Sequence, residues 1–162
     1  MKPYITLTKP HNPIHQEKDI TLTRANMEQD IRWKQRLQNF SRAIKLLQEV
    51  PELDLQQLSF LEKEGIIQRF EYTLELAWKT LKDKMENDGI ILDKISPKMV
   101  LKEAYKAKYI SNIELWIEMV NDRNLLSHTY DFETFEEIIA DIQLHYTGLL
   151  SDLYTTLIEC QL

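Results

Sequence analysis

The stretch DFETFEEIIADIQLHYTGLLSDL, residues 131–153, carries the clearest structural pattern in the chain. Its apolar residues recur every three or four positions, which places them on one face of a helix. They are Phe135, Ile139, Ile142, Tyr146, Leu149 and Leu153. Asp131 precedes them and can cap the helix, because a carboxylate accepts hydrogen bonds from the free N–H groups of a first turn. The stretch predicts a long amphipathic helix that buries one face.

The same period predicts two more long helices towards the N-terminus. The first covers residues 28–49 and ends before Pro51, and the second begins after Ser59 and ends before Gly89. Ser59 and Glu62 have the spacing of a capping box. Glycine commonly follows the end of a helix, because it adopts the left-handed conformation without strain. Both ends of the second helix are therefore marked in the sequence.

Two further helices lie between these segments and the final one. Ser96-Pro97 provides a cap followed by a proline at the first helical position, which predicts a short helix to about Lys106. Another helix is expected from about Asn112 to Ser127. The sequence thus predicts an all-α fold, an up-and-down four-helix bundle with one short inserted helix.

Residues 1–27 differ from the rest of the chain. They contain three of the five prolines, several threonines and no helical period. We expect an extended or disordered leader over 1–27 and a helical bundle domain over 28–162. A related hypothesis is that translation naturally begins at Met27.

The composition excludes several classes of protein. With 162 residues and a net charge of −6, the chain fits one domain and does not have the basic surface of a protein that coats nucleic acid or anionic lipid. Cys160 is the single cysteine, so no intramolecular disulfide and no zinc-type spacing is present. No apolar run is long enough to span a membrane, and we predict a cytoplasmic protein. No glycine-rich phosphate loop or metal-binding motif is evident, so neither a cofactor nor a metal is expected.

The stretch DRNLLSHTYD, residues 122–131, gathers an arginine, a histidine and a tyrosine at the predicted end of a helix. Arg123, His128 and Tyr130 can converge only if the helix stops near His128, as a following cap at Asp131 requires. Histidine exchanges protons at neutral pH, and arginine binds phosphate with a planar fork of donors. The trio suits metal-independent RNA cleavage or nucleotide binding, although an ordinary surface hydrogen-bond cluster is an alternative.

A second constellation lies in FEYTLELAWK, residues 70–79. Glu71, Glu75 and Lys79 are spaced to form one line along a helix, away from the face that carries the apolar residues. This line is either a solvated, salt-bridged surface or a means of orienting Arg123 towards a phosphate. Glu71 and Glu75 are therefore candidate substrate-binding residues. Asn124, next to Arg123 in the sequence, is a further candidate.

The three tryptophans are expected to have structural roles. Trp33, Trp78 and Trp116 lie on the predicted helices. Large aromatic side chains dominate the packing of cores and interfaces. We interpret them as anchors of the core or of a dimer interface.

The stretches FEYTLELAWKTLKD, SPKMVLKEAYKAKYI and ELWIEMVNDRNLLSHTYD, with the final helix, resemble the nucleotidyltransferase substrate-binding protein family, a branch of the HEPT-type proteins. The resemblance runs collinearly from about Met27 to Leu157. It implies a four-helix bundle, usually a homodimer, similar to the helical substrate-binding domain of kanamycin nucleotidyltransferase. It also implies a partner, a minimal nucleotidyltransferase encoded nearby.

In HEPT toxins the motif is an arginine, four to six residues, a histidine, one residue and a tyrosine. Arg123, His128 and Tyr130 match this motif. The resemblance implies that Arg123 and His128 are the catalytic residues of a ribonuclease, and that Tyr130 is the tyrosine to which the partner adds AMP. Related proteins are described instead as non-catalytic subunits that bind a nucleotide or another substrate, and a purely structural helical dimer is a third alternative.

Overall fold

The computed structural model describes residues 13–128 and 131–162, and all its regular elements in these ranges are helical. The main helices are α1 (Pro13–Leu47), α2 (Phe60–Asn87), α3 (Pro97–Lys106), α4 (Ile113–Leu126), α5 (Phe132–Asp141) and α6 (Thr147–Glu159). The short elements are η1 (Val50–Glu52), η2 (Leu55–Gln57) and η3 (Ile142–Tyr146). The predicted all-α helical bundle is confirmed.

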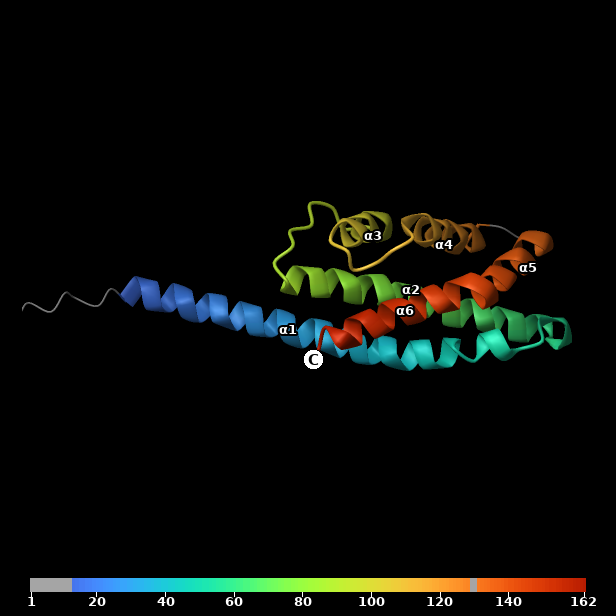
Figure 1. The fold of residues 1–162 in the computed structure, drawn as a ribbon, viewed down its shortest axis with the longest axis horizontal. Coiled ribbons are helices and arrows are strands. Elements are labelled where there is room, and N and C mark those ends of the chain that lie inside the picture. Colours follow the sequence, from blue (N-terminus) through green and yellow to red (C-terminus); the bar gives the residue numbers. More distant parts are fainter. Residues whose placement is uncertain (1–12, 129–130) are drawn as a thin grey trace, which may run out of the picture.

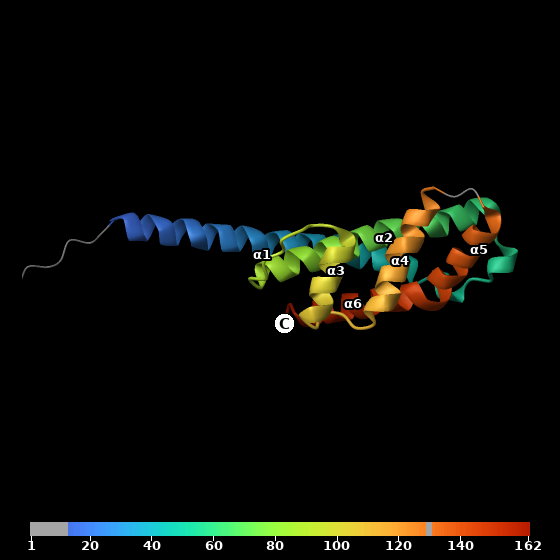
Figure 2. The same ribbon diagram turned by 90° about the horizontal axis from the view of Figure 1, so that it is seen from above.

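Helices α1 and α2 form the long axis of the bundle and lie side by side (Figures 1 and 2). The C-terminal helix α6 packs against both α1 and α2. Helices α3 and α4 run across α2 rather than along it (Figure 2). This arrangement brings the end of α4 and the start of α5 to the N-terminal end of α2.

The core consists of the apolar faces that the sequence predicts. Phe40, Phe70 and Leu81 are fully buried between the helices, as is Ile139 from the final stretch. The three tryptophans are also buried, with exposed fractions of 2% for Trp33, 9% for Trp78 and 1% for Trp116. Their burial supports an anchoring role rather than one as stacking platforms for bases.

The predicted helix ends agree with the backbone. Ser59 and Glu62 form a complete capping box at the start of α2, and Asp131 caps α5 by accepting from the Thr134 N–H. After α2, Gly89 takes a φ of 84° and the Ile90 N–H donates to Met85 O. This pattern, with the Gly89 N–H donating to Glu86 O, is the Schellman motif that stops a helix.

The second half of the expected leader differs from the prediction. Residues 13–27 belong to α1 rather than to an extended segment, and the helix begins at Pro13, a residue favoured at a first helical position. Residues 17–28 are exposed along their whole length, and Figure 1 shows this part of α1 extending beyond the bundle. The prediction relied on an apolar period, which these residues lack. The helix forms here without burying one face, so its sequence carries no such period. Residues 1–12 lie outside the described residues.

The final helix contains one turn that the sequence does not predict. The element η3 is a single π-helical turn between α5 and α6, in which the Thr147 N–H and the Thr147 hydroxyl both donate to Ile142 O. A π turn adds one residue without breaking the helix, and it shifts the side chains around the axis. Tyr146 is buried as predicted and stacks on Phe70 with ring centroids 5.7 Å apart, whereas after the turn Leu150 is fully buried and the predicted Leu149 is only partly buried.

No helix in the described part of the chain combines the length and the hydrophobicity needed to cross a lipid bilayer.

Candidate functional site

The end of α4 determines where the predicted catalytic residues lie. The helix stops at Leu126, Ser127 follows as its C-cap, and the His128 N–H donates to Leu125 O at 2.9 Å. Arg123 lies in the last turn, where a positive charge interacts favourably with the helix dipole. The helix therefore ends where the sequence requires, with His128 exposed just beyond it. Tyr130 lies outside the described residues.

Arg123 faces α2. Its Nε lies 3.9 Å from Glu71 Oε1, and its Nη1 donates to Asn124 Oδ1 at 3.5 Å. Both contacts are long, and the Arg123 side chain remains 41% exposed. Guanidinium groups donate five hydrogen bonds in a fixed fork, so most of the donor capacity of Arg123 is open to an anion.

Glu75 belongs to the same electrostatic group, one helical turn beyond Glu71. Partial burial raises the pKa of Glu75, but hydrogen bonds from Lys79 and Trp78, together with the charges of Lys79 and Arg123, hold it below its ordinary value. The Lys79 Nζ lies 2.5 Å from Glu75 Oε1, and the Trp78 indole donates at 3.0 Å. Glu75 is thus a fixed carboxylate that supports Arg123 from a distance, whereas Glu71 contacts it.

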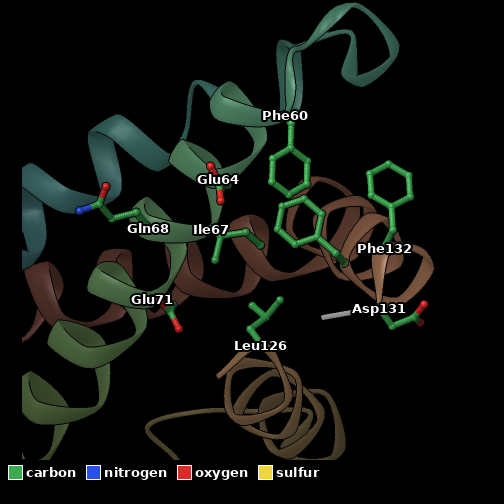
Figure 3. A pocket seen from close by; sticks show the side chains of 9 residues that line it. Phe60, Glu64, Ile67, Gln68, Glu71, Leu126, Asp131 and Phe132 are labelled. Atoms are coloured by element: carbon green, nitrogen blue, oxygen red, sulfur yellow. The ribbon is translucent and has the colours of Figure 1, made fainter. Parts of the chain in front are cut away.

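A hollow opens beside this ion pair, between the start of α2, the end of α4 and the start of α5 (Figure 3). Its volume is about 460 Å³. The lining residues are Phe60, Glu64, Ile67, Gln68, Glu71, Leu126, Asp131, Phe132 and Phe135. Ligand sites are commonly concave and apolar with a few polar groups, and this hollow has that character. Glu71 connects the hollow to Arg123.

Three phenylalanine rings form the apolar wall of the hollow. The ring centroids of Phe60 and Phe132 are 6.2 Å apart, and those of Phe60 and Phe135 are 5.0 Å apart. Phe60 and Phe132 each follow a capping residue, Ser59 and Asp131, at the first position of a helix. Two capped helix starts therefore meet here and present their aromatic rings to solvent, Phe60 being 51% and Phe132 61% exposed.

The aromatic wall is not evident from the sequence alone. One signal was available: each phenylalanine directly follows a residue predicted to cap a helix, so each ring lies at the very start of its helix. What could not be read from the sequence is that the two helix starts lie next to each other.

Asp122, the neighbour of Arg123, points to a different side of α4. It accepts a hydrogen bond of 2.5 Å from the Tyr146 hydroxyl. Burial raises the pKa of Asp122, the hydrogen bond from Tyr146 lowers it, and the charge of Asp141 raises it, so that the pKa lies above its ordinary value. This contact joins α4 to η3, the element that carries Tyr146.

Among the described residues, one group of acidic side chains has the spacing of possible metal ligands. Glu118, Asp122 and Asp141 each bring one oxygen to within 4.8 Å of the others. No sequence motif predicts this cluster, because Asp141 lies on another helix. Tyr146 already occupies one oxygen of Asp122, and the raised pKa favours a proton on that carboxyl group.

Three comparisons place the chain among known proteins. Residues 35–159 match the sequence profile of the family described as nucleotidyltransferase substrate binding protein like. A protein of Haemophilus influenzae (strain ATCC 51907 / DSM 11121 / KW20 / Rd) named "Probable ribonuclease HepT" is 36% identical over 81 residues, which are 48% of this chain and 56% of the relative. This match therefore spans little more than half of that relative.

A crystal structure of a protein from Thermus thermophilus is also similar. It has a TM-score of 0.62 and 31% sequence identity, and the alignment covers 70% of this chain and 94% of that protein. The family profile itself covers most of the chain, from within α1 to the end of α6. The chain belongs to the nucleotidyltransferase substrate-binding protein family.

Proposed function

We propose that this protein is a HEPT-type ribonuclease that acts as a toxin beside a minimal nucleotidyltransferase. The observation that carries the proposal is the position of Arg123, half-exposed at the end of α4 and held by Glu71 beside an open hollow, with His128 exposed at the same helix end. The resemblance of part of the chain to the protein named "Probable ribonuclease HepT" supports the same interpretation.

The proposed chemistry needs no metal. His128 removes the proton from a ribose 2′-hydroxyl, and the 2′ oxygen forms a bond to the adjacent phosphorus. Arg123 donates hydrogen bonds to the non-bridging phosphate oxygens as their negative charge increases. The bond between phosphorus and the 5′ oxygen then breaks, and an acid returns a proton to that oxygen. The products are a 2′,3′-cyclic phosphate and a 5′-hydroxyl.

A homodimer would supply the acid. Each chain offers one motif histidine, so a base and an acid require either two copies that meet or a solvent molecule as the acid. We propose a homodimer in which the ends of α4 from two copies approach each other.

The proposed switch is the transfer of AMP to Tyr130 by the nucleotidyltransferase. The phenolic oxygen attacks the α-phosphorus of ATP, pyrophosphate leaves, and the phenol loses its proton. The added group is bulky and negatively charged, so it would repel an RNA phosphate two residues from His128.

The test is induction in bacteria without the nucleotidyltransferase, with growth and RNA integrity followed in parallel. Wild-type protein is expected to arrest growth and cleave RNA, whereas His128→Ala and Arg123→Ala do neither. His145→Ala, which removes another exposed histidine, on η3, is the matched control and should behave as wild type. Soluble wild-type protein that carries no AMP and leaves RNA intact would refute ribonuclease activity.

A second candidate is a non-catalytic subunit that binds a nucleotide or another substrate for the nucleotidyltransferase. The hollow beside Arg123 favours it, because a binding subunit needs a site but no acid or base. In this case nucleotide binding depends on Arg123 and is unchanged in His128→Ala, and neither protein cleaves RNA. Isothermal titration of the purified protein with nucleotides, together with the RNA cleavage assay, separates the two candidates.

A further inference from the structure

We infer that the hollow between α2, α4 and α5 is a nucleobase site, which holds a base of the ligand whose phosphate meets Arg123. The inference rests on the proposed function and names the part of the substrate that the site recognises. Three features of the described residues support it. They are an exposed aromatic wall at the start of α2, polar groups along one face of α2, and the partly exposed side chain of Arg123 beside Glu71 on that face.

The aromatic wall fits the flat face of a base. Phe60 and Phe132 are both more than half exposed, although large apolar rings are normally buried in a protein of this size. The two ring planes are 25° from parallel and their centroids are 6.2 Å apart, so a flat base that stacks on one ring lies nearly parallel to the other. Bases stack on such surfaces in proteins that bind single strands, whatever their sequence, because every base has a π face.

The polar groups of the hollow lie where the edge of a stacked base would be. Glu64, Gln68 and Glu71 are spaced four and three residues apart, so they follow one face of α2 from Phe60 towards Arg123. Glu64 and Gln68 are exposed. A carboxylate accepts from N–H groups, and an amide both donates and accepts. Adenine, cytosine and guanine carry an exocyclic amino group that suits Glu64, whereas uracil carries none.

The spacing along α2 joins the base site to the phosphate site. Phe60 and Glu71 are eleven residues apart, which is about 16 Å along the helix axis, given a rise of about 1.5 Å per residue. Glu71 contacts Arg123, whose side chain is 41% exposed. A strand of two or more nucleotides is long enough to place one base on the phenylalanine rings and a phosphate at Arg123. The carboxylates of the hollow would repel a phosphate placed deeper, which orients the nucleotide in this direction.

The same hollow could hold the base of a free nucleotide or of an RNA strand. The first probe is AMP, and the second is a dinucleotide of adenine whose first sugar lacks the 2′-hydroxyl and therefore cannot be cleaved. Binding is measured by isothermal titration with full-length protein that mass spectrometry shows to be unmodified at Tyr130. Dinucleotide bound more tightly than AMP indicates an RNA strand, and the reverse indicates a free nucleotide.

Phe60→Ala and Phe132→Ala are each expected to weaken binding of the better probe about tenfold, because stacking on one aromatic side chain typically accounts for that much or more. Inorganic phosphate, which has no base, should bind both variants as it binds wild type. Tyr105→Ala is the matched control, since Tyr105 is an aromatic residue on α3 that is 48% exposed and outside the hollow. Glu64→Gln should reduce the preference for AMP over UMP.

Several outcomes would overturn the base site. The first is that the probes bind wild type and both phenylalanine variants equally. The second is that neither probe binds to wild type at millimolar concentration. The third is that the phenylalanine variants lose self-association but keep their affinity for nucleotides. The last result would make the aromatic wall a protein interface. Circular dichroism checks folding, and Phe60→Leu replaces Phe60→Ala if the latter is unfolded.

The experiments distinguish an error in the proposed base site from an error in the proposed ribonuclease activity. Probe binding that depends on Phe60 and Phe132, combined with intact RNA, retains the base site and rejects the ribonuclease. RNA cleavage by wild type at a rate that neither phenylalanine variant changes retains the ribonuclease and rejects the base site.

Discussion

Asp122 shows how one partly buried carboxyl group makes the stability of the fold depend on pH. Its carboxyl group is partly buried against Tyr146 and faces Asp141, and burial is the main reason that its pKa is raised. A carboxyl group with a higher pKa in the folded chain than in the unfolded chain binds its proton more tightly when folded. Its charged form therefore reduces stability above the folded pKa, and this loss disappears as the pH falls towards the ordinary aspartate value of about 3.9.

Asp122→Asn is accordingly expected to raise stability at neutral pH and to flatten its dependence on pH just above 4. The amide keeps an oxygen that can accept from Tyr146 and removes the charge. We expect the thermal midpoint to rise by about 2–4 °C at pH 7, which corresponds to about 1 kcal/mol in a domain of this size. Thermal melts between pH 4 and pH 8 provide the measurement. Asp152→Asn, at an exposed position on α6, is the control, and a lower midpoint for Asp122→Asn at pH 7 would contradict the argument.

Lys108 is strained at the level of its own backbone. It follows the end of α3 with a φ of 65°, and its N–H donates to Tyr105 O while the Tyr109 N–H donates to Ala104 O. Glycine has no Cβ and occupies this left-handed conformation without steric cost. Lys108→Gly should stabilise the protein by about 0.5–1 kcal/mol in urea denaturation. Lys108→Ala removes the same side chain but keeps the Cβ, so an equal gain from both variants would assign the effect to the lysine charge instead.

At the scale of elements, an ion pair between a partly exposed arginine and a buried aspartate joins α1 to α2. Arg36 Nη1 lies 3.0 Å from Asp83 Oδ2, and the Asp83 side chain is only 2% exposed. Lys82 approaches the other oxygen of Asp83 at 3.2 Å. By contrast, Lys34 and Asp30 form a pair within α1 that is more than 40% exposed on both sides. A buried carboxylate depends on its partners, whereas an exposed pair is largely replaced by water.

Arg36→Ala is therefore expected to lower the free energy of unfolding by about 1–3 kcal/mol. This is less than the loss for a fully buried pair, because the Arg36 side chain is 31% exposed and Lys82 still pairs with Asp83. Lys34→Ala should change it by less than about 0.5 kcal/mol. Urea denaturation measures both. The double variant Arg36→Met with Asp83→Leu removes both charges and should recover most of the loss. Equal effects of the two single substitutions would reject this role for the α1–α2 pair.

At the scale of the whole molecule, the first part of α1 does not belong to the packed bundle. Residues 17–28 are exposed, and the first fully apolar contact with the core is Trp33, which is 2% exposed. The family profile begins at residue 35, within the same helix. The free energy of folding should therefore come from the part of the chain that follows residue 28.

A chain that begins at Met27 is expected to melt within about 2 °C of the full-length protein, because residues 17–26, whose burial the structure describes, are all exposed. A chain that begins at Lys34 loses Trp33 and should be less stable by about 3–5 kcal/mol, the usual cost of removing a buried tryptophan side chain. Differential scanning calorimetry of the three proteins tests this. A large drop for the chain from Met27 would show that the first part of α1 packs against something, such as a second copy.

The sequence determined the helices and much of their boundaries, because these depend on local signals. The period of three and four in residues 131–153, the capping box at Ser59 and Glu62, and the glycine at 89 each act within a few residues. The helix start at Pro13 and the π turn Ile142–Tyr146 were not predicted. Neither leaves a periodic signal: the first has no buried face, and the second adds a residue to a continuous helix.

The sequence also determined which residues are candidates for chemistry, since Arg123 and His128 stand at a marked helix end. Only the tertiary structure decided what surrounds them. Glu71 reaches Arg123 because α4 crosses α2, and Phe60 meets Phe132 because the starts of α2 and α5 lie together. These pairs are separated by about 50 to 70 positions in the sequence. The physical reason is that helix formation is local, whereas the neighbours of an exposed side chain depend on how the buried faces of distant helices pack.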